Sequence, residues 1–374
     1  MTAHPSVPRH PDSSAGRLRV AIVGTGAVSR LHAQAVAAHP RADLVAVTDR
    51  TRERADEFAV TWSVPSVYDS LDELLEAQHP DVVLICTPPG VHREQTLAAF
   101  AAGAHVVVEK PPAPSLDELD EMLAAAAKAD RRLAVVFQQR TGTAAAHVRR
   151  LLQDGALGRP LLATCETLWY RDAAYYAVDW RGRWSTEGGG TTLGHGIHQL
   201  DLLAFLLGDW ASVQGRLWRL DRETETEDAS TATVTFASGV VAQVVTSAVS
   251  PREVSAIRID TQRATVSVEH LYGHGHENWS ITPAPGTESD PAWALPADEE
   301  RSDHGPLLRD VFDALLDGTP LPDTATDPGR SFSLVAAIYA SAAADGAAVT
   351  AEDLRSHPTH RSGFASPVID QRRV

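Results

Sequence analysis

A short β-branched segment that runs directly into a glycine-rich loop constrains the fold of this chain more than any other feature. Residues 18–23 read LRVAIV, residues 24–29 read GTGAVS, and residues 29–38 have the periodicity of a helix. A strand, a glycine turn and a helix in this order form the phosphate-binding unit of dinucleotide-binding folds. Gly24 allows the tight turn and Gly26 lets the backbone approach a pyrophosphate, so we predict a dinucleotide site here.

The same alternation of apolar strands and helical segments continues to about residue 139. Further strands are expected at 44–48, 81–86, 105–109 and 133–137. Continuous apolar strands separated by helices are typical of a parallel sheet that is covered on both faces. We therefore predict a doubly wound parallel sheet, a Rossmann domain of the α/β class, over residues 17–139.

The pattern changes after residue 140. Long strand-like runs follow at 160–170, 213–220, 229–236, 240–249 and 254–268. Few helical segments separate them, and the Ser238-Gly239 pair is typical of a hairpin turn. This pattern predicts a C-terminal α+β domain with a large, mostly antiparallel, open sheet.

We assign residues 140–374 to this second domain and expect it to bind the substrate and to mediate oligomerisation. Residues 283–303 are rich in proline and acidic residues and are expected to form a surface loop. Residues 1–16 are rich in Pro, His and Ser without an apolar stretch, so we expect a disordered tail.

The chain is acidic and has no long apolar segment. Its 374 residues carry 33 Lys and Arg against 49 Asp and Glu, a formal net charge of −16. Such a charge repels phosphate backbones and anionic lipids, so we expect neither a nucleic-acid nor a membrane partner. No apolar run reaches the ~20 residues of a membrane span. We expect a soluble cytoplasmic protein whose two cysteines, Cys86 and Cys165, are reduced and buried.

The residues after the second strand bear on which dinucleotide binds. Asp49 ends that strand, where a carboxylate can bind the hydroxyls of the adenosine ribose, and this favours NAD. Arg50 follows directly, and a guanidinium there can pair with a 2′-phosphate, so NADP stays possible. Ala27 and Val28 complete the loop before the helix, whose N-terminus offers unpaired N–H groups to an anion.

Two further motifs give the chain a resemblance to a known family. Residues 87–89 read TPP after the third strand, and residues 109–111 read EKP after the fourth. Together with the glycine loop and a late DPGRSFSLVAAIYAS segment at 327–341, they resemble the Gfo/Idh/MocA family, named after glucose-fructose oxidoreductase, inositol dehydrogenase and rhizopine catabolism. The resemblance covers residues from about 17 to 345.

This resemblance implies a role for Lys110 in catalysis and a cis bond before Pro111. From the residues alone, Lys110 lies past the carboxyl end of a parallel strand, where it can donate hydrogen bonds to a substrate hydroxyl; a solvated surface lysine is the alternative. Glu109 is expected to hold the ammonium. The residues that we expect to contact the cofactor in this part of the chain are Thr87, Pro88, His92, Glu109 and Lys110.

The segment GGGTTLGHGIHQLD, residues 188–201, departs from the family at one position. The family usually carries an Asp, then a His four residues later, then an Asp three residues after that; His198 and Asp201 match, but Gly194 replaces the first Asp. The resemblance implies that His198 is the general base. His195 is one turn away and can share that duty. A carboxylate from elsewhere can replace the missing one, and Asp179 and Glu166 are the candidates.

A metal site is an alternative interpretation of the same segment. His195, His198 and Asp201 are spaced three apart, as ligands on one helical face can be. No further cluster of Cys or His supports this reading, and the family needs no metal, so we expect none.

An aromatic and arginine-rich stretch precedes the glycine triplet. Residues 169–184 read WYRDAAYYAVDWRGRW. Aromatic faces stack on the C–H faces of sugars and arginine binds hydroxyls or carboxylates, so this stretch can form a wall of the substrate site. An oligomer interface is an equally good explanation, because such interfaces are enriched in the same residues. The candidates for substrate contact are Arg171, Tyr176, Trp180, Arg181, His195 and His198.

These features predict an NAD(P)-dependent oxidoreductase that acts on a secondary hydroxyl of a sugar, inositol or related polyol. In this hypothesis Lys110 polarises the hydroxyl oxygen and His198 takes the proton. One alternative is an enzyme that cleaves glycosides through transient oxidation of the sugar, and another is a non-catalytic dinucleotide sensor. The resemblance also implies a homo-oligomer, a dimer or a tetramer.

Overall fold

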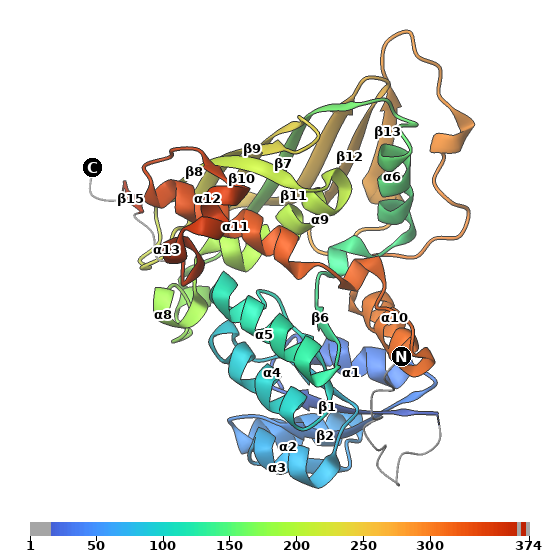
Figure 1. Cartoon of the computed structure of the whole chain (residues 1–374), viewed down its shortest axis with the longest axis vertical. Coiled ribbons are helices and arrows are strands. Elements are labelled where there is room, and N and C mark those ends of the chain that lie inside the picture. Colours follow the sequence, from blue (N-terminus) through green and yellow to red (C-terminus); the bar gives the residue numbers. More distant parts are fainter. Residues whose placement is uncertain (1–15, 365–367, 372–374) are drawn as a thin grey trace, which may run out of the picture.

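The computed structural model describes residues 16–364 and 368–371, so the tail expected at 1–16 lies almost wholly outside the described residues. Figure 1 shows a parallel sheet with its helices in blue and teal below, and a second, larger sheet above. The first sheet has six strands in the order β3-β2-β1-β4-β5-β6, all of them parallel. The strands are β1 (Leu18–Val23), β2 (Ala42–Thr48), β3 (Ser66–Tyr68), β4 (Val82–Ile85), β5 (His105–Val108) and β6 (Leu133–Val135).

Helices cover both faces of the parallel sheet, as the continuous apolar strands predicted. Along β4, Val82 and Leu84 pack with residues of α1, whereas Val83 and Ile85 pack with residues of α4 and α5. The helices of this part are α1 (Ser29–Ala38), α2 (Arg52–Trp62), α3 (Leu71–Gln78), α4 (His92–Ala101) and α5 (Leu116–Ala129). This strand order reverses direction between β1 and β4, and such a switch point forms a ligand crevice at the carboxyl ends of the strands.

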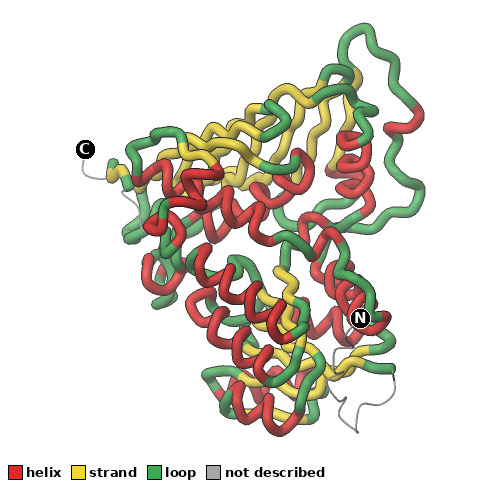
Figure 2. The backbone as a smooth tube through the Cα atoms, in the orientation of Figure 1, coloured by secondary structure: helices red, strands yellow, loops and turns green. Residues whose placement is uncertain are grey.

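The second sheet has nine described strands in the order β13-β12-β11-β7-β10-β9-β8-β14, with β15 beside β8. It is mixed but mostly antiparallel, because only the pairs β7–β10 and β8–β15 run parallel. Figure 2 shows it as the upper yellow layer, with helices between it and the parallel sheet. Its strands are β7 (Pro160–Tyr170), β8 (Trp210–Arg219), β9 (Ala229–Phe236), β10 (Val241–Ser247), β11 (Val249–Thr261), β12 (Ala264–His270), β13 (Trp279–Pro283), β14 (Val349–Thr350) and β15 (Ile369–Asp370).

One expected strand, at 254–268, is in fact two. β11 ends at Thr261, β12 begins at Ala264, and the two pair antiparallel. The turn between them is fixed by Thr261, whose hydroxyl oxygen lies 2.6 Å from the Leu157 carbonyl oxygen and 2.7 Å from that of Ala264 and can donate to one of them. The turn predicted at Ser238-Gly239 is confirmed, since it joins the antiparallel strands β9 and β10 and Gly239 has a φ of +86°.

Helices pack on one face of the second sheet, and one helix returns to the first domain. Figure 1 shows α6, α9 and α11 on the side of the second sheet that faces the Rossmann domain, and α10 beside α1. Phe312 and Val311 of α10 belong to the same apolar core as Val36 of α1, so the chain after residue 139 contributes to both layers. These helices are α6 (Thr143–Gln153), α7 (Ala173–Tyr176), α8 (Trp184–Glu187), α9 (Ile197–Leu207), α10 (His304–Asp317), α11 (Pro328–Ala343), α12 (Ala351–Ser356) and α13 (Pro358–Arg361).

Two predictions from composition are tested by the fold. Cys86 and Cys165 are both free thiols and both buried, as expected. Among the described residues, none of the helices combines the length and the apolar character that crossing a membrane requires.

Candidate active site

A cleft of ≈ 1350 Å³ runs along the carboxyl ends of the parallel strands, between the two domains. It contains most of the residues that the sequence singled out. Two of them, His92 and Tyr176, are not among its lining residues. The predicted residues that do line it are Gly24, Gly26, Ala27, Val28, Asp49, Arg50, Thr87, Pro88, Glu109, Lys110, Arg171, Trp180, Arg181, His195 and His198.

The glycine loop forms one end of the cleft. Gly24 has a φ of +86°, and a Cβ there would lie 2.9 Å from the Thr87 side chain and 3.0 Å from the Cys86 backbone. At Gly26, by contrast, a Cβ would meet nothing within 4 Å, so the space above this residue is open to a ligand. No side chain caps the amino end of α1, which lies behind the loop. The loop therefore fits a pyrophosphate, which would bind to the free N–H groups of the helix.

Asp49 directly follows β2 and lines the cleft beside this loop. Its carboxylate accepts hydrogen bonds from the Thr25 and Thr51 amides and from the Arg54 guanidinium, each at 2.8 Å. Burial by itself would raise the pKa of Asp49, but these three donors outweigh it and lower the pKa. Arg50 is exposed at the same rim. A fixed anion at this point suits ribose hydroxyls and opposes a 2′-phosphate.

His92 lies behind the wall of the cleft and holds two of its loops together. The ring is fully buried, with Nε2 2.7 Å from the Thr87 carbonyl oxygen and Nδ1 3.0 Å from that of Pro111. The structure therefore gives His92 a role in joining the TPP and EKP segments, and no contact with the cleft. The Lys110–Pro111 bond is cis, as the resemblance implied.

Lys110 lies at the centre of the cleft, after the end of β5. Its Nζ donates a hydrogen bond to the Gly194 carbonyl at 3.0 Å, which joins the EKP segment to the glycine-rich segment of the second domain. Burial lowers the pKa of Lys110 to about 8, with Glu109 opposing and Arg181 adding to that shift. The side chain is therefore an ammonium at neutral pH and can lose its proton with little cost.

Behind Lys110, Glu109 is held in what we call the buried cluster, which comprises His32, Glu109 and His304. Glu109 Oε1 lies 2.8 Å from His32 Nε2 and 3.1 Å from His304 Nε2. Burial would raise the pKa of Glu109, but the two imidazoles outweigh it and hold that pKa well below its usual range. His32 belongs to α1 and His304 begins α10, so neither residue is near the EKP motif in sequence.

The imidazoles of the buried cluster differ in charge. Burial lowers the pKa of His32, whereas Asp303 and Glu109 overcome burial and raise the pKa of His304 to about 9. His304 therefore carries the positive charge and His32 is neutral. A neutral His32 donates from Nε2 to Glu109, which leaves Nδ1 as an acceptor, and within the described residues this Nδ1 has no partner.

His198 faces the cleft from the start of α9. The helix is preceded by a π-helical turn over Thr192–Gly196, a distortion that is frequent at functional sites. His198 is buried, its Nδ1 has no hydrogen-bond partner among the described residues, and its ring centroid lies 6.3 Å from that of Trp169. Burial and then the Lys110 ammonium lower the pKa of His198 well below its usual value, so the ring is neutral and able to accept a proton.

The remaining wall of the cleft is a set of polar residues that we call the wall cluster: Arg171, Tyr175, Arg181, Glu187 and His195. The Tyr175 hydroxyl lies 3.0 Å from His195 Nε2, and Arg171 Nε donates to the same nitrogen at 3.3 Å. The Arg181 guanidinium donates to the Tyr175 hydroxyl and lies 3.8 Å above its ring. Tyr176, which was expected to contact substrate, instead packs edge-on against Tyr175 at 5.1 Å.

Glu187 is the carboxylate that lies beside Gly194. A Cβ built on Gly194 would be 3.7 Å from Glu187 Oε1, while Oε2 accepts a hydrogen bond from the Gly182 amide at 2.6 Å. Burial raises the pKa of Glu187 to about 7. Neither carboxylate that we considered from the sequence takes this place: Asp179 is exposed at the cleft, and Glu166, on β7, does not line it.

Asp201 has a structural role that separates it from the two histidines. It is fully buried, and Arg140 Nε donates to its Oδ2 at 2.8 Å, which anchors α9 to the segment after β6. A metal site of His195, His198 and Asp201 is therefore not formed. The only described group with ligand-like geometry is the buried cluster, and its separations are those of hydrogen bonds.

Glu227, which the sequence analysis did not single out, braces the glycine triplet. Its carboxylate accepts from the Gly190 amide at 3.1 Å, the Thr192 amide at 3.0 Å and the Tyr339 hydroxyl at 2.7 Å. A Cβ on Gly190 would lie 2.1 Å from the Glu227 carbonyl oxygen, so only glycine fits there. The triplet thus positions the π-helical turn and His198.

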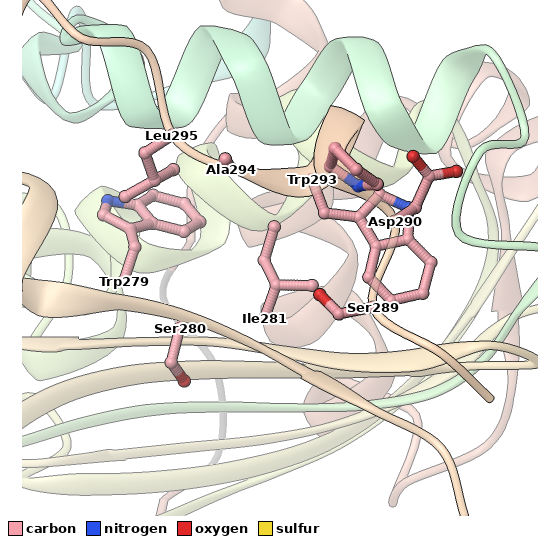
Figure 3. A pocket seen from close by; sticks show the side chains of 9 residues that line it. Trp279, Ser280, Ile281, Ser289, Asp290, Trp293, Ala294 and Leu295 are labelled. Carbon is pink, nitrogen blue, oxygen red and sulfur yellow. The ribbon is translucent and has the colours of Figure 1, made fainter. Parts of the chain in front are cut away.

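A second, smaller cavity of ≈ 280 Å³ lies away from this site, between β13 and residues 289–295. Figure 3 shows Ile281 between the indole rings of Trp279 and Trp293, with Leu295 above Trp279. Asp290 is its one charged residue, and its carboxylate caps the short helix that follows by accepting from the Ala292 amide. The cavity is therefore explained by packing of the long loop against the sheet.

Comparison with known proteins identifies related sequences over both domains. Residues 18–137 match the model of the GFO_IDH_MocA oxidoreductase family, described as an NAD-binding Rossmann fold. Residues 145–268 match the model of the GFO/IDH/MocA C-terminal domain.

Individual relatives and solved structures extend over most of the chain. The D-glucoside 3-dehydrogenase of Escherichia coli K12 is 32% identical over 277 residues, which are 68% of this chain and 78% of that protein. The D-apiose dehydrogenase of Paraburkholderia graminis is 28% identical and covers 87% of this chain and 88% of its own length. The crystal structure of the WlbA dehydrogenase from Bordetella pertussis, in complex with NADH and UDP-GlcNAcA, is 27% identical, with a TM-score of 0.80 over 89% of this chain and 98% of that one.

Proposed function

The chain belongs to the Gfo/Idh/MocA family of oxidoreductases, and from that premise we propose that it transfers hydride between a nicotinamide cofactor and a secondary hydroxyl of a sugar, inositol or related polyol. One observation carries the proposal. The cleft that begins at the dinucleotide loop, with Gly24, Gly26 and Asp49, continues without interruption to Lys110 and His198. A dinucleotide seated on the loop thus has its reactive end beside two groups that can move a proton.

The side chains divide the chemistry between them. When bound, the nicotinamide supplies the hydride acceptor for alcohol oxidation. The Lys110 ammonium donates a hydrogen bond to the substrate oxygen and favours its deprotonation. His198, which is neutral, accepts the hydroxyl proton. Positioning contributes much of the rate, because both groups are held by the backbone around Gly194.

The wall cluster suits a carbohydrate. Arg171 and Arg181 offer guanidinium donors to hydroxyl or carboxylate oxygens, and Trp180 offers an aromatic face. His195 shares the proton transfer or contacts a substrate hydroxyl. The relatives are named for sugars and glycosides, and the WlbA structure contains a sugar nucleotide, which supports the same substrate class here.

The cofactor is NAD in this proposal. Asp49 keeps its negative charge at the rim of the cleft, where it favours ribose hydroxyls over a 2′-phosphate. Arg50 at the same rim leaves room for some use of NADP. Thr87, Pro88, Ala27 and Val28 complete the contacts with the dinucleotide.

Reduction of NAD and NADP should be measured by absorbance with a panel of inositols, free sugars, sugar acids and glycosides. Lys110→Ala and His198→Ala are each expected to lower kcat/KM by about 10²- to 10⁴-fold while NAD still binds by calorimetry. Lys128→Ala, an exposed lysine on α5, is the matched control and should leave activity unchanged. Tight NAD binding without turnover of any substrate would contradict the dehydrogenase, and aglycone release from the glycosides would then indicate glycoside cleavage.

The protein is proposed to act in the cytoplasm as a homo-oligomer. Its two cysteines are free thiols, which fits a reducing compartment. In Figure 1 no described helix covers the side of the second sheet away from α9 and α11, and we propose this side as the contact with a second copy. Light scattering on the purified protein tests this, and a monomer at micromolar concentration would contradict it.

A further inference from the structure

We propose that Glu187 is the positioning residue of the Lys110 reaction centre: its carboxylate lies beside the place of a side chain at position 194, and its charge holds the Lys110 ammonium in place. The inference rests on the proposed function for its role in catalysis. Its structural basis is independent of that function, and the tests below separate the two.

Glu187 and Lys110 lie on two sides of the same residue. Glu187 Oε1 would be 3.7 Å from a Cβ on Gly194, and Lys110 Nζ donates to the Gly194 carbonyl at 3.0 Å. Position 194 itself has no side chain, so a carboxylate reaches this point only from another segment. Glu187, seven residues earlier, is the residue that supplies it.

The position of Glu187 is fixed by its neighbours. It ends the short helix α8, and the next residue, Gly188, has a φ of +80°, which turns the chain sharply into the glycine triplet. Its Oε2 is held by the Gly182 amide at 2.6 Å, and its Oε1 lies 3.4 Å from the Arg181 guanidinium. The side chain is buried, so solvent screens its charge little.

The charges around Lys110 show what Glu187 adds. Two carboxylates, Glu109 and Glu187, stabilise the ammonium, whereas Arg181 and Arg171 oppose it. Burial is the largest influence on this ammonium, and it lowers the pKa of Lys110. His195 and His198 face the same space but are neutral. Loss of the charge of Glu187 would remove one of the two described acids that favour this ammonium most, and would leave Glu109 to oppose Arg171 and Arg181.

Glu187 itself is faced by three charged groups. Burial raises its pKa to about 7, with Arg181 and Lys110 favouring its ionised form and Glu227 opposing it. Its charge therefore changes in the range where the enzyme would work. This makes the state of Lys110 depend on the protonation of Glu187.

The test moves the carboxylate from position 187 to position 194. Glu187→Ala removes it, and Gly194→Asp adds a second acid beside the first, since the new Cβ fits at 3.7 Å from Oε1 and its carboxylate would repel that of Glu187. Each single variant is expected to lose about 100-fold in kcat/KM, because both disturb the position of Lys110. The double variant, which has one carboxylate again, should recover to within about 10-fold of the wild type.

A second readout does not depend on turnover. The chain has two lysines, Lys110 and Lys128, so labelling by a small amine-reactive reagent, followed by peptide mass spectrometry, reports each one separately. In Glu187→Gln, which keeps an acceptor for the Gly182 amide, the pH midpoint of Lys110 labelling should fall by about one unit. The midpoint should return to its wild-type value in the double variant Glu187→Ala/Gly194→Asp. Labelling of the exposed Lys128 serves as the internal reference in every sample.

Each outcome decides between the proposals. Unchanged Lys110 labelling in Glu187→Gln, or a double variant no more active than the singles, would overturn the role of Glu187. The same labelling shift produced by Asp179→Asn instead would assign that role to Asp179. Glu166→Gln, on the strand β7, is the control and should match the wild type. If labelling follows the prediction but the wild type oxidises no substrate, the inference holds and the proposed function fails.

Discussion

Two buried carboxylates act on the charge of Lys110, and they differ in their partners and in their pKa. Glu109 and Glu187 are 6% and 7% exposed, yet the pKa of Glu109 is well below its usual range and that of Glu187 is raised to about 7. The partners account for the difference. Two imidazoles contact Glu109 at 2.8 and 3.1 Å, whereas Glu187 has one amide at 2.6 Å and a guanidinium at 3.4 Å.

The comparison shows that burial alone does not decide the charge of an acid; the groups that replace its lost water do. The buried cluster gives a permanent anion behind Lys110. The wall cluster gives an acid that gains and loses its proton near neutral pH. A lysine with one acid of fixed charge and one acid of variable charge nearby can be held in place and have its pKa adjusted.

The largest effect on stability is expected from removing the fixed anion, Glu109. Glu109→Ala removes the buried one of the two carboxylates that hold the His304 cation, so we expect it to lower the free energy of unfolding by about 3 to 5 kcal/mol. Denaturant unfolding at neutral pH measures this. Glu76→Ala, an exposed glutamate on α3, is the control and should stay within about 0.5 kcal/mol of the wild type. An equally small effect for Glu109→Ala would show that the buried cluster does not stabilise the fold.

The second prediction uses the pH dependence of the same cluster. The pKa of His304 is raised from 6.5 to about 9, so the stability it contributes is complete below pH 6.5 and is lost as the pH rises through about 9. The deficit of His304→Gln relative to the wild type should therefore shrink by about 3 kcal/mol across this window. Unfolding curves at several pH values test it. A deficit that is independent of pH would mean that His304 is not charged in the folded protein.

The third prediction concerns Glu187 in the wall cluster, whose ionisation should lower the stability of the folded protein. The pKa of Glu187 is raised to about 7, so the folded state retains a proton that the unfolded chain has lost above its ordinary pKa of 4.5. Wild-type stability should fall as the pH rises through this range, and Glu187→Gln, which carries no charge, should be more stable than the wild type at pH 8 by about 2 kcal/mol. At pH 4, where both are neutral, the difference should vanish. If Glu187→Gln were instead less stable than the wild type at pH 8, the charge of Glu187 would stabilise the fold, as that of Glu109 does.

The fold was largely predictable because its signals are local. The glycine loop and the apolar strands each depend on a few neighbouring residues, and so do the caps of α3 and α5, where Ser70 and Ser115 accept hydrogen bonds from the Glu73 and Glu118 amides. The strand β3 was missed because three residues carry no pattern. The turn at residues 262–263 was missed because it contains neither Gly nor Pro, and Thr261 fixes it through contacts with Leu157, distant in sequence.

The site was predictable only where motifs carry it. Lys110 and His198 belong to such motifs, and they meet at one cleft. His32 and His304 join Glu109 only because α1 and α10 pack side by side, which no spacing reveals. The composition of the aromatic stretch predicted a wall of the substrate site, but it did not show which side chains face the cleft. Neighbouring positions in a short helix point in different directions, so Tyr175 lines the cleft and Tyr176 does not.

The π-helical turn at Thr192–Gly196 has a consequence for how this segment can vary in length. A turn closed by i→i+5 hydrogen bonds holds one residue more than an α-helical turn. Deleting that residue would restore a regular helix but rotate every side chain before it by about 100° relative to His198. The glycine triplet is anchored by Glu227, so it cannot follow such a rotation. Insertions and deletions should therefore be absent between Gly190 and His198 in active relatives.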